Sequence, residues 1–257
     1  MLPHVHIGNL EIPTYGICMV IGIMAAAIIA IIRAKRTGRD ENSLIVIAAC
    51  AVGLGLAGAK ILYIIASYGL QKALQEMSQG NFSCFTEGGL VFYGGLIGGI
   101  GGAYIGAAIA KEKLTSYIDA VVPCVPLGHA FGRLGCFLGG CCYGMPYEGF
   151  GSVTFPAVGV NHGVFPVQLV EMVINIGIFV YLIHFTKKER GKYTVLFVYM
   201  GLYGVSRFLL EMLRGDSIRG IANGLSTSQW ISIALIIVSL IPVITRLMKK
   251  KGGSAPA

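Results

Sequence analysis

Apolar residues run in seven long stretches along the chain, and short polar stretches separate them. The apolar stretches cover about residues 15–32, 44–66, 89–110, 117–138, 166–185, 193–213 and 226–247. Because about 20 apolar residues span the hydrocarbon core of a bilayer, each stretch predicts a transmembrane helix. We therefore predict an all-α, polytopic membrane protein of about seven helices, with residues 1–248 in a single membrane-embedded domain. The basic segment 249–257 is expected to be a disordered tail.

Basic residues are unevenly distributed between these stretches, and this predicts how the helices are oriented. Fourteen of the 20 basic residues follow the first, third, fifth or seventh stretch. The opposite side of the membrane carries Lys72, Arg214 and Arg219. The positive-inside rule then places the N-terminus outside and the C-terminus in the cytoplasm. This topology, with attraction to anionic headgroups, accounts for the net charge of +8, so no nucleic-acid partner is expected.

Composition supports the membrane class. Charged residues make up 12% of the chain, whereas a soluble domain has about 25%. The 37 glycines indicate closely packed helices. The N-terminus has no basic region before the first stretch, which is long enough to span, so we expect no cleavable signal peptide.

Three basic residues lie inside apolar stretches, namely Lys60, Arg133 and Arg207. A charge there costs about 2.5–3.5 kcal/mol even on the most lenient scale, so such residues usually face a partner or a polar cavity. Glu211 follows Arg207 by four positions, and the two can pair on one helix face. The predicted topology brings Arg133 and Arg207 towards the outer leaflet. Because guanidinium groups bind phosphate through a fork of donors, we expect an anionic phospholipid as the ligand.

Six short motifs occur in order along the chain. They are Thr14-Tyr15-Gly16-Ile17, Gly58-Ala59-Lys60-Ile61-Leu62-Tyr63, EGGLVFYGGLIGG (87–99), GRLGCFLGGCCYG (132–144), Pro166-Val167-Gln168-Leu169-Val170-Glu171 and Tyr203-Gly204-Val205-Ser206-Arg207-Phe208-Leu209-Leu210-Glu211. Together they resemble the motifs of the bacterial prolipoprotein diacylglyceryl transferases over nearly the whole chain. The resemblance implies a multi-pass transferase of the bacterial cytoplasmic membrane. Such an enzyme transfers the diacylglyceryl group of phosphatidylglycerol to the lipobox cysteine thiol of a secreted prolipoprotein, releasing glycerol phosphate without a metal or cofactor.

The same resemblance implies roles for individual residues. Arg133 and Arg207 would bind the phosphate, Glu211 would orient Arg207, and Tyr15 and Tyr203 would hydrogen-bond the headgroup or assist proton transfer. The other residues expected to contact or support the substrate are Lys60, Gly94, Gly95, Cys136, Gln168 and Glu171. His129, in the segment that leads to the signature, could line the site, although a histidine on an apolar face is more often a core residue.

Four positions differ from the usual family pattern. Tyr93 stands where the family usually has the histidine that is the expected base, and Lys60 stands for an arginine. In the signature, Cys136 replaces an asparagine and Cys141 a glutamate. Two hypotheses remain open. Either the reaction is unchanged and Tyr93 assists as a hydrogen-bond donor, or the same phospholipid donor serves another acceptor, such as a glycan or polyol hydroxyl.

The seven cysteines fall into two groups. Cys18, Cys50 and Cys124 lie in apolar stretches and are expected to be buried, whereas Cys84, Cys136, Cys141 and Cys142 lie near the outer face. A disulfide from Cys84 to Cys141 or Cys142 is one alternative. A metal site is another, but no histidine stands at a usual zinc spacing, so no metal is expected. A covalent shuttle through Cys136 or Cys141 is a third.

A lipid or anion transporter is the rival class, because buried arginines and glycine-broken helices also line transport paths. The sequence contains no internal repeat, and its polar residues gather at one face of the membrane instead of crossing it. The pattern therefore favours an enzyme.

Overall fold

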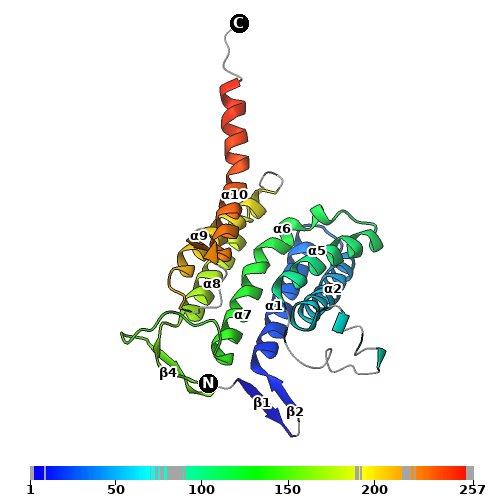
Figure 1. The fold of residues 1–257 in the computed structure, drawn as a ribbon. Helices are drawn as coiled ribbons and strands as arrows, with labels where there is room; N and C mark the ends of the chain where they lie inside the picture. Colours follow the sequence, from blue (N-terminus) through cyan, green and yellow to red (C-terminus); the bar gives the residue numbers. More distant parts are fainter. Residues whose placement is uncertain are drawn as a thin grey trace. The chain divides into compact units, whose positions relative to one another are not determined.

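The structure is a computed structural model that describes residues 3–8, 10–69, 71–72, 75, 78–79, 89, 91–188, 191, 193–215, 221–222 and 224–252 (Figure 1). Its helices are α1 (Thr14–Arg36), α2 (Glu41–Tyr68), α5 (Phe92–Ile109), α6 (Ile118–Val121), α7 (Val125–Gly139), α8 (Val167–Phe185), α9 (Thr194–Glu211) and α10 (Thr227–Gly252). Short 3-10 turns cover Leu114–Ser116, Val122–Cys124 and Pro156–Val158. The strands are β1 (His4–Ile7), β2 (Leu10–Pro13), β3 (Val153–Phe155), β4 (Val160–Val164), β5 (Ile221–Ala222) and β6 (Leu225–Ser226).

All seven predicted apolar stretches are helical. Among the described residues, five helices are long and apolar enough to cross a membrane: Thr14–Arg36, Glu41–Tyr68, Ile118–Gly139, Val167–Phe185 and Thr194–Glu211. The other two stretches form shorter apolar helices at Tyr93–Ile109 and Thr227–Pro242. The mostly helical membrane fold is thus confirmed, while the count of seven spans and the orientation of the termini stay predictions. Of the predicted tail, residues 249–252 belong to α10 and residues 253–257 lie outside the described part.

The chain divides into two compact units, and the single membrane-embedded domain stays a prediction. The first comprises Met1–Ala30 with Ile118–Ala257, and the second comprises Ile31–Tyr117. In the first unit α7, α8, α9 and α10 pack in chain order, each against the next (Figure 1). Val122, Ile178, Leu182 and Val195 form a buried apolar cluster among them. Pro123 and Pro126 interrupt the fourth apolar stretch, which is therefore divided into α6, a 3-10 turn and α7.

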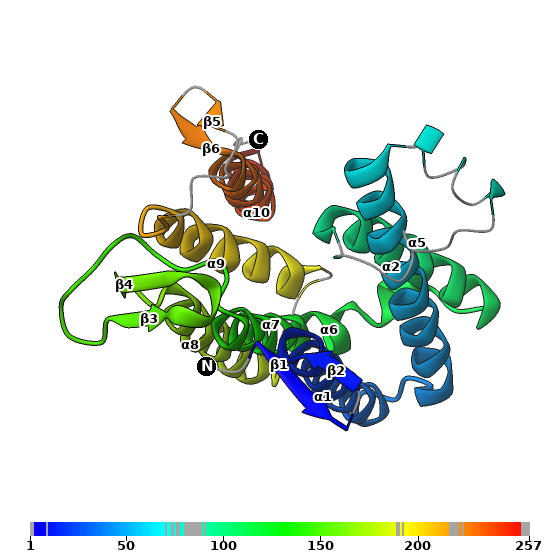
Figure 2. The same ribbon diagram turned by 60° about the horizontal axis from the view of Figure 1, so that its bottom comes forward.

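Three antiparallel hairpins were not predicted: β1–β2, β3–β4 and β5–β6 (Figure 2). The β3–β4 hairpin belongs to the connection from α7 to α8, and its residues Phe155, Val160 and Val164 form a small core of their own. The backbone amide of Gly144 donates to the carbonyl of Phe165, and that of Met145 donates to Leu213 at the end of α9. These bonds fix the connection at the end of the bundle where α7 ends and α8 begins.

In the second unit α2 packs closely against α5 through glycine faces. A Cβ at Gly58 would collide with the carbonyl of Gly94, and a Cβ at Gly98 would collide with the carbonyl of Leu54. The glycines therefore allow the two backbones to approach, as small residues do in membrane helix pairs. The packing gives Gly94 a structural role within this unit.

Candidate functional site

Two arginines and two glutamates form one ion-paired group in the first unit, which we call the arginine–glutamate cluster (Arg133, Glu171, Arg207 and Glu211). Nε of Arg133 lies 3.0 Å from Oε1 of Glu171, while Nη1 of Arg207 lies 3.2 Å from Oε2 of the same carboxylate. Nη2 of Arg207 lies 2.8 Å from Oε2 of Glu211, the partner predicted from the four-residue spacing. Glu171 thus joins the two arginines, a contact that the sequence did not predict.

Chain connectivity explains why these side chains meet. Arg133 is in the last two turns of α7, Glu171 in the first two turns of α8, and Arg207 and Glu211 in the last two turns of α9. Successive helices run in opposite directions, so these segments lie at the same end of the bundle. Ser226 and Ser228, at the start of α10, complete the site. The hydroxyl of Ser226 donates to Oε1 of Glu211 at 3.0 Å, and Nη2 of Arg207 donates to the hydroxyl of Ser228 at 3.3 Å.

The two arginines differ in how many of their guanidinium nitrogens contact an acceptor of the protein. Arg207 is buried and uses Nη1 and Nη2 on Glu171, Glu211 and Ser228. Arg133 is more accessible, with 21% of its side chain exposed, and contacts Glu171 through Nε. No residue in the described ranges accepts from Nη1 or Nη2 of Arg133. The cluster is formally neutral, so its accessible positive potential is concentrated at the two terminal nitrogens of Arg133.

Two buried amides adjoin the cluster. Nε2 of Gln168 donates to the carbonyl of Cys141 at 2.8 Å, and Nδ2 of Asn175 donates to the carbonyl of Glu171 at 2.8 Å. Within the part of the chain that the structure covers, nothing donates to Oε1 of Gln168 or Oδ1 of Asn175. Since a buried polar atom is normally hydrogen-bonded, both oxygens are candidate acceptors for a substrate hydroxyl or for water.

His129 lies one helical turn before Arg133 on α7. Its Nδ1 and the hydroxyl of Tyr199 share a hydrogen bond of 3.2 Å, and its ring lies 5.3 Å from that of Tyr203. Its i,i+4 spacing from Arg133 is the sequence signal that places the two side chains on one helix face. The structure therefore brings an imidazole and two phenol rings to the same face of α7 as Arg133.

Tyr15 also belongs to this unit. A Cβ at Gly135 would lie 3.1 Å from Cδ2 of Tyr15, so the glycine admits this ring against α7. Tyr15 is 40% exposed. It lies within range of electrostatic interaction with Arg133 and Cys136. The structure thus brings together the predicted residues Tyr15, Arg133 and Cys136.

Four predicted residues belong to the second unit: Lys60, Tyr93, Gly94 and Gly95. The ammonium of Lys60 lies 5.1 Å from the centre of the Tyr63 ring, a cation–π contact within α2. Tyr93, in the first turn of α5, is 46% exposed. The roles of these four residues in the site stay predictions.

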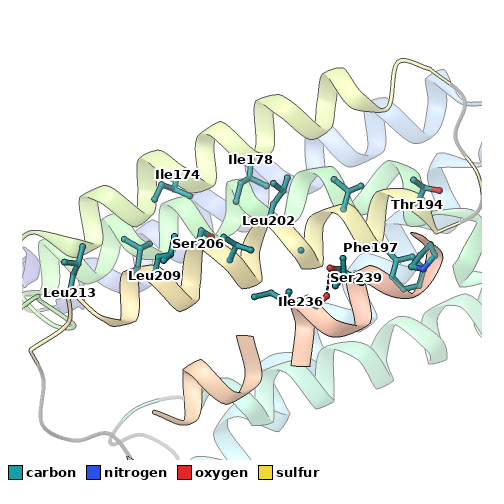
Figure 3. A pocket seen from close by; sticks show the side chains of 16 residues that line it. Ile174, Ile178, Thr194, Phe197, Leu202, Ser206, Leu209, Leu213, Ile236 and Ser239 are labelled. Carbon is teal, nitrogen blue, oxygen red and sulfur yellow. Dashed lines mark hydrogen bonds between the residues drawn. The ribbon is translucent and has the colours of Figure 1, made fainter. Parts of the chain in front are cut away.

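An apolar groove of about 810 Å³ runs between α8, α9 and α10 (Figure 3). Ile174 and Ile178 line it from α8, Leu202 and Leu209 from α9, and Ile236 from α10. Leu210, which also lines it, lies between Arg207 and Glu211 in the sequence. The groove therefore reaches the segment of α9 that carries the polar cluster.

The chain is similar to known proteins over most of its length. The model of the prolipoprotein diacylglyceryl transferase family matches residues 3–245. The chain is 34% identical over 239 residues to the phosphatidylglycerol–prolipoprotein diacylglyceryl transferase of Clostridium tetani, covering 90% of this chain and 92% of the relative. It is 34% identical over 247 residues to the enzyme of that name from Clostridioides difficile, covering 95% of each. It is 33% identical to the second such enzyme of Clostridium perfringens, covering 89% of each.

The chain belongs to the prolipoprotein diacylglyceryl transferase family. It is therefore a membrane transferase of lipoprotein biosynthesis, as the motifs predicted. The large apolar residues that α1 exposes, including Val20, Met24 and Ile28, are consistent with a helix in lipid.

Three cysteines form a second compact group of side chains in the first unit. Cys136, Cys141 and Cys142 bring their sulfurs within 4.8 Å of one another, and we call them the thiol cluster. All three are free thiols. Hydrogen bonds from Cys136 and Cys141 lower the pKa of the Cys142 thiol, and the charges of Arg214 and Arg133 act in the same direction against the opposing effect of burial. Cys84, the other partner of the predicted disulfide, lies outside the described residues.

Proposed function

We propose that the chain transfers the diacylglyceryl group of phosphatidylglycerol to the lipobox cysteine thiol of a prolipoprotein at the outer face of the bacterial cytoplasmic membrane. Family membership supports the reaction, and the names of the relatives supply both substrates. The observation that carries the proposal is the accessible guanidinium fork of Arg133 beside Arg207, at the end of a bundle with an apolar groove.

The phosphate of the donor lipid binds to Nη1 and Nη2 of Arg133, because a planar fork of donors matches two phosphate oxygens. Arg207, held by Glu171 and Glu211, adds a second positive charge without moving. Such preorganised charge stabilises the negative charge that develops as the phosphate leaves. Oε1 of Gln168 is available to accept from a glycerol hydroxyl.

The lipid's apolar part occupies the groove between α8, α9 and α10. Its lining is mostly apolar, with Leu209, Leu210 and Leu213 at the end nearest the cluster. In phosphatidylglycerol the two acyl chains are ester-linked to the other two carbons of the glycerol whose third carbon reacts. An apolar groove that begins beside the charged cluster therefore fits both parts of one lipid.

The reaction forms a carbon–sulfur bond as the carbon–oxygen bond to phosphate breaks. The bonding electron pair leaves with glycerol phosphate, and the thiol loses its proton because the thiolate is the competent nucleophile. We assign this proton to His129, whose imidazole is neutral before the reaction because burial and the charge of Arg133 disfavour its protonated form. Its contacts with Tyr199 and Tyr203 orient the ring beside Arg133. Tyr93 then acts as a hydrogen-bond donor.

The test is a transfer assay on purified protein in nanodiscs with phosphatidylglycerol and a lipobox-cysteine peptide. Mass spectrometry follows the diacylglyceryl adduct, and a coupled assay follows glycerol phosphate. We expect an adduct with the wild type, none with Arg133→Ala, and a reduced rate with Arg133→Lys, which keeps the charge but loses the fork. Phosphatidylethanolamine is the control donor.

If phosphatidylglycerol binds tightly but no adduct forms, the lipobox thiol is not the acceptor. Acceptors with a hydroxyl group would then be tested. For the base, His129→Gln should remove the transfer step while phosphatidylglycerol binding is retained. A His129→Gln variant with wild-type turnover would instead exclude His129 as the proton acceptor.

A further inference from the structure

The thiol cluster takes no part in the transfer mechanism above, yet it is the tightest group of potential metal ligands among the described residues. Each cysteine offers one sulfur, and the three sulfurs lie within 4.8 Å of one another. In a tetrahedral zinc site with Zn–S bonds of about 2.3 Å, thiolate sulfurs are about 3.8 Å apart. Small side-chain rotations therefore suffice to bring all three sulfurs to bonding distance of one ion.

The backbone holds the cluster in this arrangement. α7 ends at Gly139, and Gly140 takes a left-handed conformation with φ of 73°, which turns the chain back on the helix. The amide of Cys141 then donates to the carbonyl of Cys136 at 3.0 Å. Cys142 has a φ of 61°, which is uncommon for a residue other than glycine. Gln168 fixes the loop from α8 by donating to the carbonyl of Cys141.

Burial and charge also suit a bound cation. Cys136 is buried, Cys142 is partly buried and Cys141 is exposed, so the cluster has a protected base and an open side for access. Three thiolates around a divalent ion leave one net negative charge. Arg133, one turn before Cys136 on α7, and Arg214, which pairs with Gly144 in a β-bridge, supply positive charge near the sulfurs.

We propose that Cys136, Cys141 and Cys142 form a binding site for a thiophilic metal ion, in the first place Zn²⁺, with three thiolate ligands and an open fourth position. Thiolate ligands select such ions over Mg²⁺ and Ca²⁺, which prefer oxygen. Binding exchanges protons without redox chemistry. Each thiol releases its proton as its sulfur bonds to the metal, so three protons leave for each ion bound. Cys136 and Cys141 stand where the resemblance described above leads one to expect asparagine and glutamate.

The experiment uses the full-length protein in detergent, purified with a reductant and stripped with a chelator. Co²⁺ serves as the spectroscopic probe, because thiolate coordination gives intense near-ultraviolet charge-transfer absorption. Zn²⁺ is then titrated in competition with a chromophoric chelator, and Cu⁺ is titrated in a parallel arm. We expect saturation at one ion per chain and displacement of Co²⁺ by Zn²⁺. If the protein binds Cu⁺ more tightly than Zn²⁺, the result supports the thiolate site and identifies monovalent copper as its preferred ion.

Three variants, Cys136→Ser, Cys141→Ser and Cys142→Ser, each remove one ligand. Each should weaken Zn²⁺ binding by roughly 100-fold or more, since even changes outside the ligand set cost up to about that factor. Cys124→Ala is the matched control, because Cys124 is a buried free thiol of the same unit that lies outside the cluster. It should bind Zn²⁺ like the wild type.

A second readout guards against variants that do not fold. In the wild type, bound Zn²⁺ should protect Cys136, Cys141 and Cys142 from iodoacetamide, as mapped by mass spectrometry of peptides. The proposal is overturned by Co²⁺ spectra without thiolate charge transfer, by equal Zn²⁺ affinity in the three serine variants, or by alkylation that ignores Zn²⁺. These measurements use neither phosphatidylglycerol nor peptide, so their failure would leave the transferase proposal intact.

Discussion

Glu171 is the residue through which the two arginines of the site are connected. One of its oxygens contacts Arg133 and the other contacts Arg207, and its side chain is only 5% exposed. Removing one partner of a buried ion pair leaves the other charge uncompensated, which costs about 3–5 kcal/mol. Glu171 therefore holds both guanidinium groups in position and lowers the free-energy cost of burying their charges in the bundle.

We expect Glu171→Ala to lower the thermal unfolding midpoint and to abolish transfer, because neither guanidinium keeps its shared acceptor. Glu171→Gln retains one acceptor oxygen and should be intermediate in both respects. Thermal unfolding in detergent and the transfer rate are the measurements. Equal stability and turnover in the wild type and both variants would contradict the bridging role. A matched control is Glu148→Gln, which removes a carboxylate from the connection between α7 and α8 and should leave both quantities unchanged.

Ion pairs within one helix could be predicted from the sequence, whereas ion pairs between helices could not. Arg207 and Glu211 were paired in advance because four residues bring two side chains to one helix face. Arg133 and Glu171 lie on different helices, and their contact depends on the packing of α7 against α8. The sequence analysis placed the three cysteines near one face but did not predict that their sulfurs meet, because this depends on the left-handed turn at Gly140, and glycine permits either hand.

At the scale of elements, the helices were predictable and the hairpins were not. Long apolar runs specify spanning helices because the backbone must satisfy its own hydrogen bonds in lipid. The strands have at most five residues and lie in polar connections, where alternation over so short a length carries little signal. The break between α6 and α7 was also not predicted, although Pro123 and Pro126 provide its physical cause.

The close contact between α2 and α5 predicts how glycine-to-alanine substitutions change stability. A Cβ at Gly98 would collide with the backbone carbonyl of Leu54, whereas a Cβ at Gly101 would meet nothing within 4 Å. Gly98→Ala should therefore separate the helices and cost about 1–3 kcal/mol of stability, as overpacking does. Gly101→Ala, the control on the same helix, should leave stability unchanged or raise it, because alanine is the better helix former. Equal unfolding midpoints for the two variants would contradict close packing as the reason for glycine at 98.

The proposal that the groove between α8, α9 and α10 binds the acyl chains can be tested by filling it. Val205 lines it from α9, while Val173 on α8 is 62% exposed and lies outside the lining. Val205→Trp should reduce kcat/KM for phosphatidylglycerol by about 10-fold and shift preference towards shorter acyl chains, because the ring fills space that the lipid needs. Val173→Trp should behave like the wild type. A Val205→Trp variant with unchanged kcat/KM and unchanged chain-length preference would exclude this groove as the acyl site.

At the scale of the whole molecule, the location of the C-terminus decides which side of the membrane the site faces. The arginine–glutamate cluster lies where α7 and α9 end and where α8 and α10 begin. α10 then runs away from the cluster, so the C-terminus and the cluster must lie on opposite sides of the membrane if α10 spans it. The distribution of basic residues predicts a cytoplasmic C-terminus, which makes the cluster extracytoplasmic.

A C-terminal fusion to green fluorescent protein should therefore fluoresce, and a C-terminal fusion to alkaline phosphatase should be inactive. An epitope inserted beside Gly151, in the connection that leads from α7 into the β3–β4 hairpin, should be labelled in intact spheroplasts. Lysed cells provide the control in which both the tail and the loop are accessible.

The reverse result would put the arginine–glutamate cluster in the cytoplasm. A secreted precursor would then have to be modified before export, with the acceptor reaching the cluster from the cytoplasm. The topology measurement thus tests the acceptor as directly as it tests the fold.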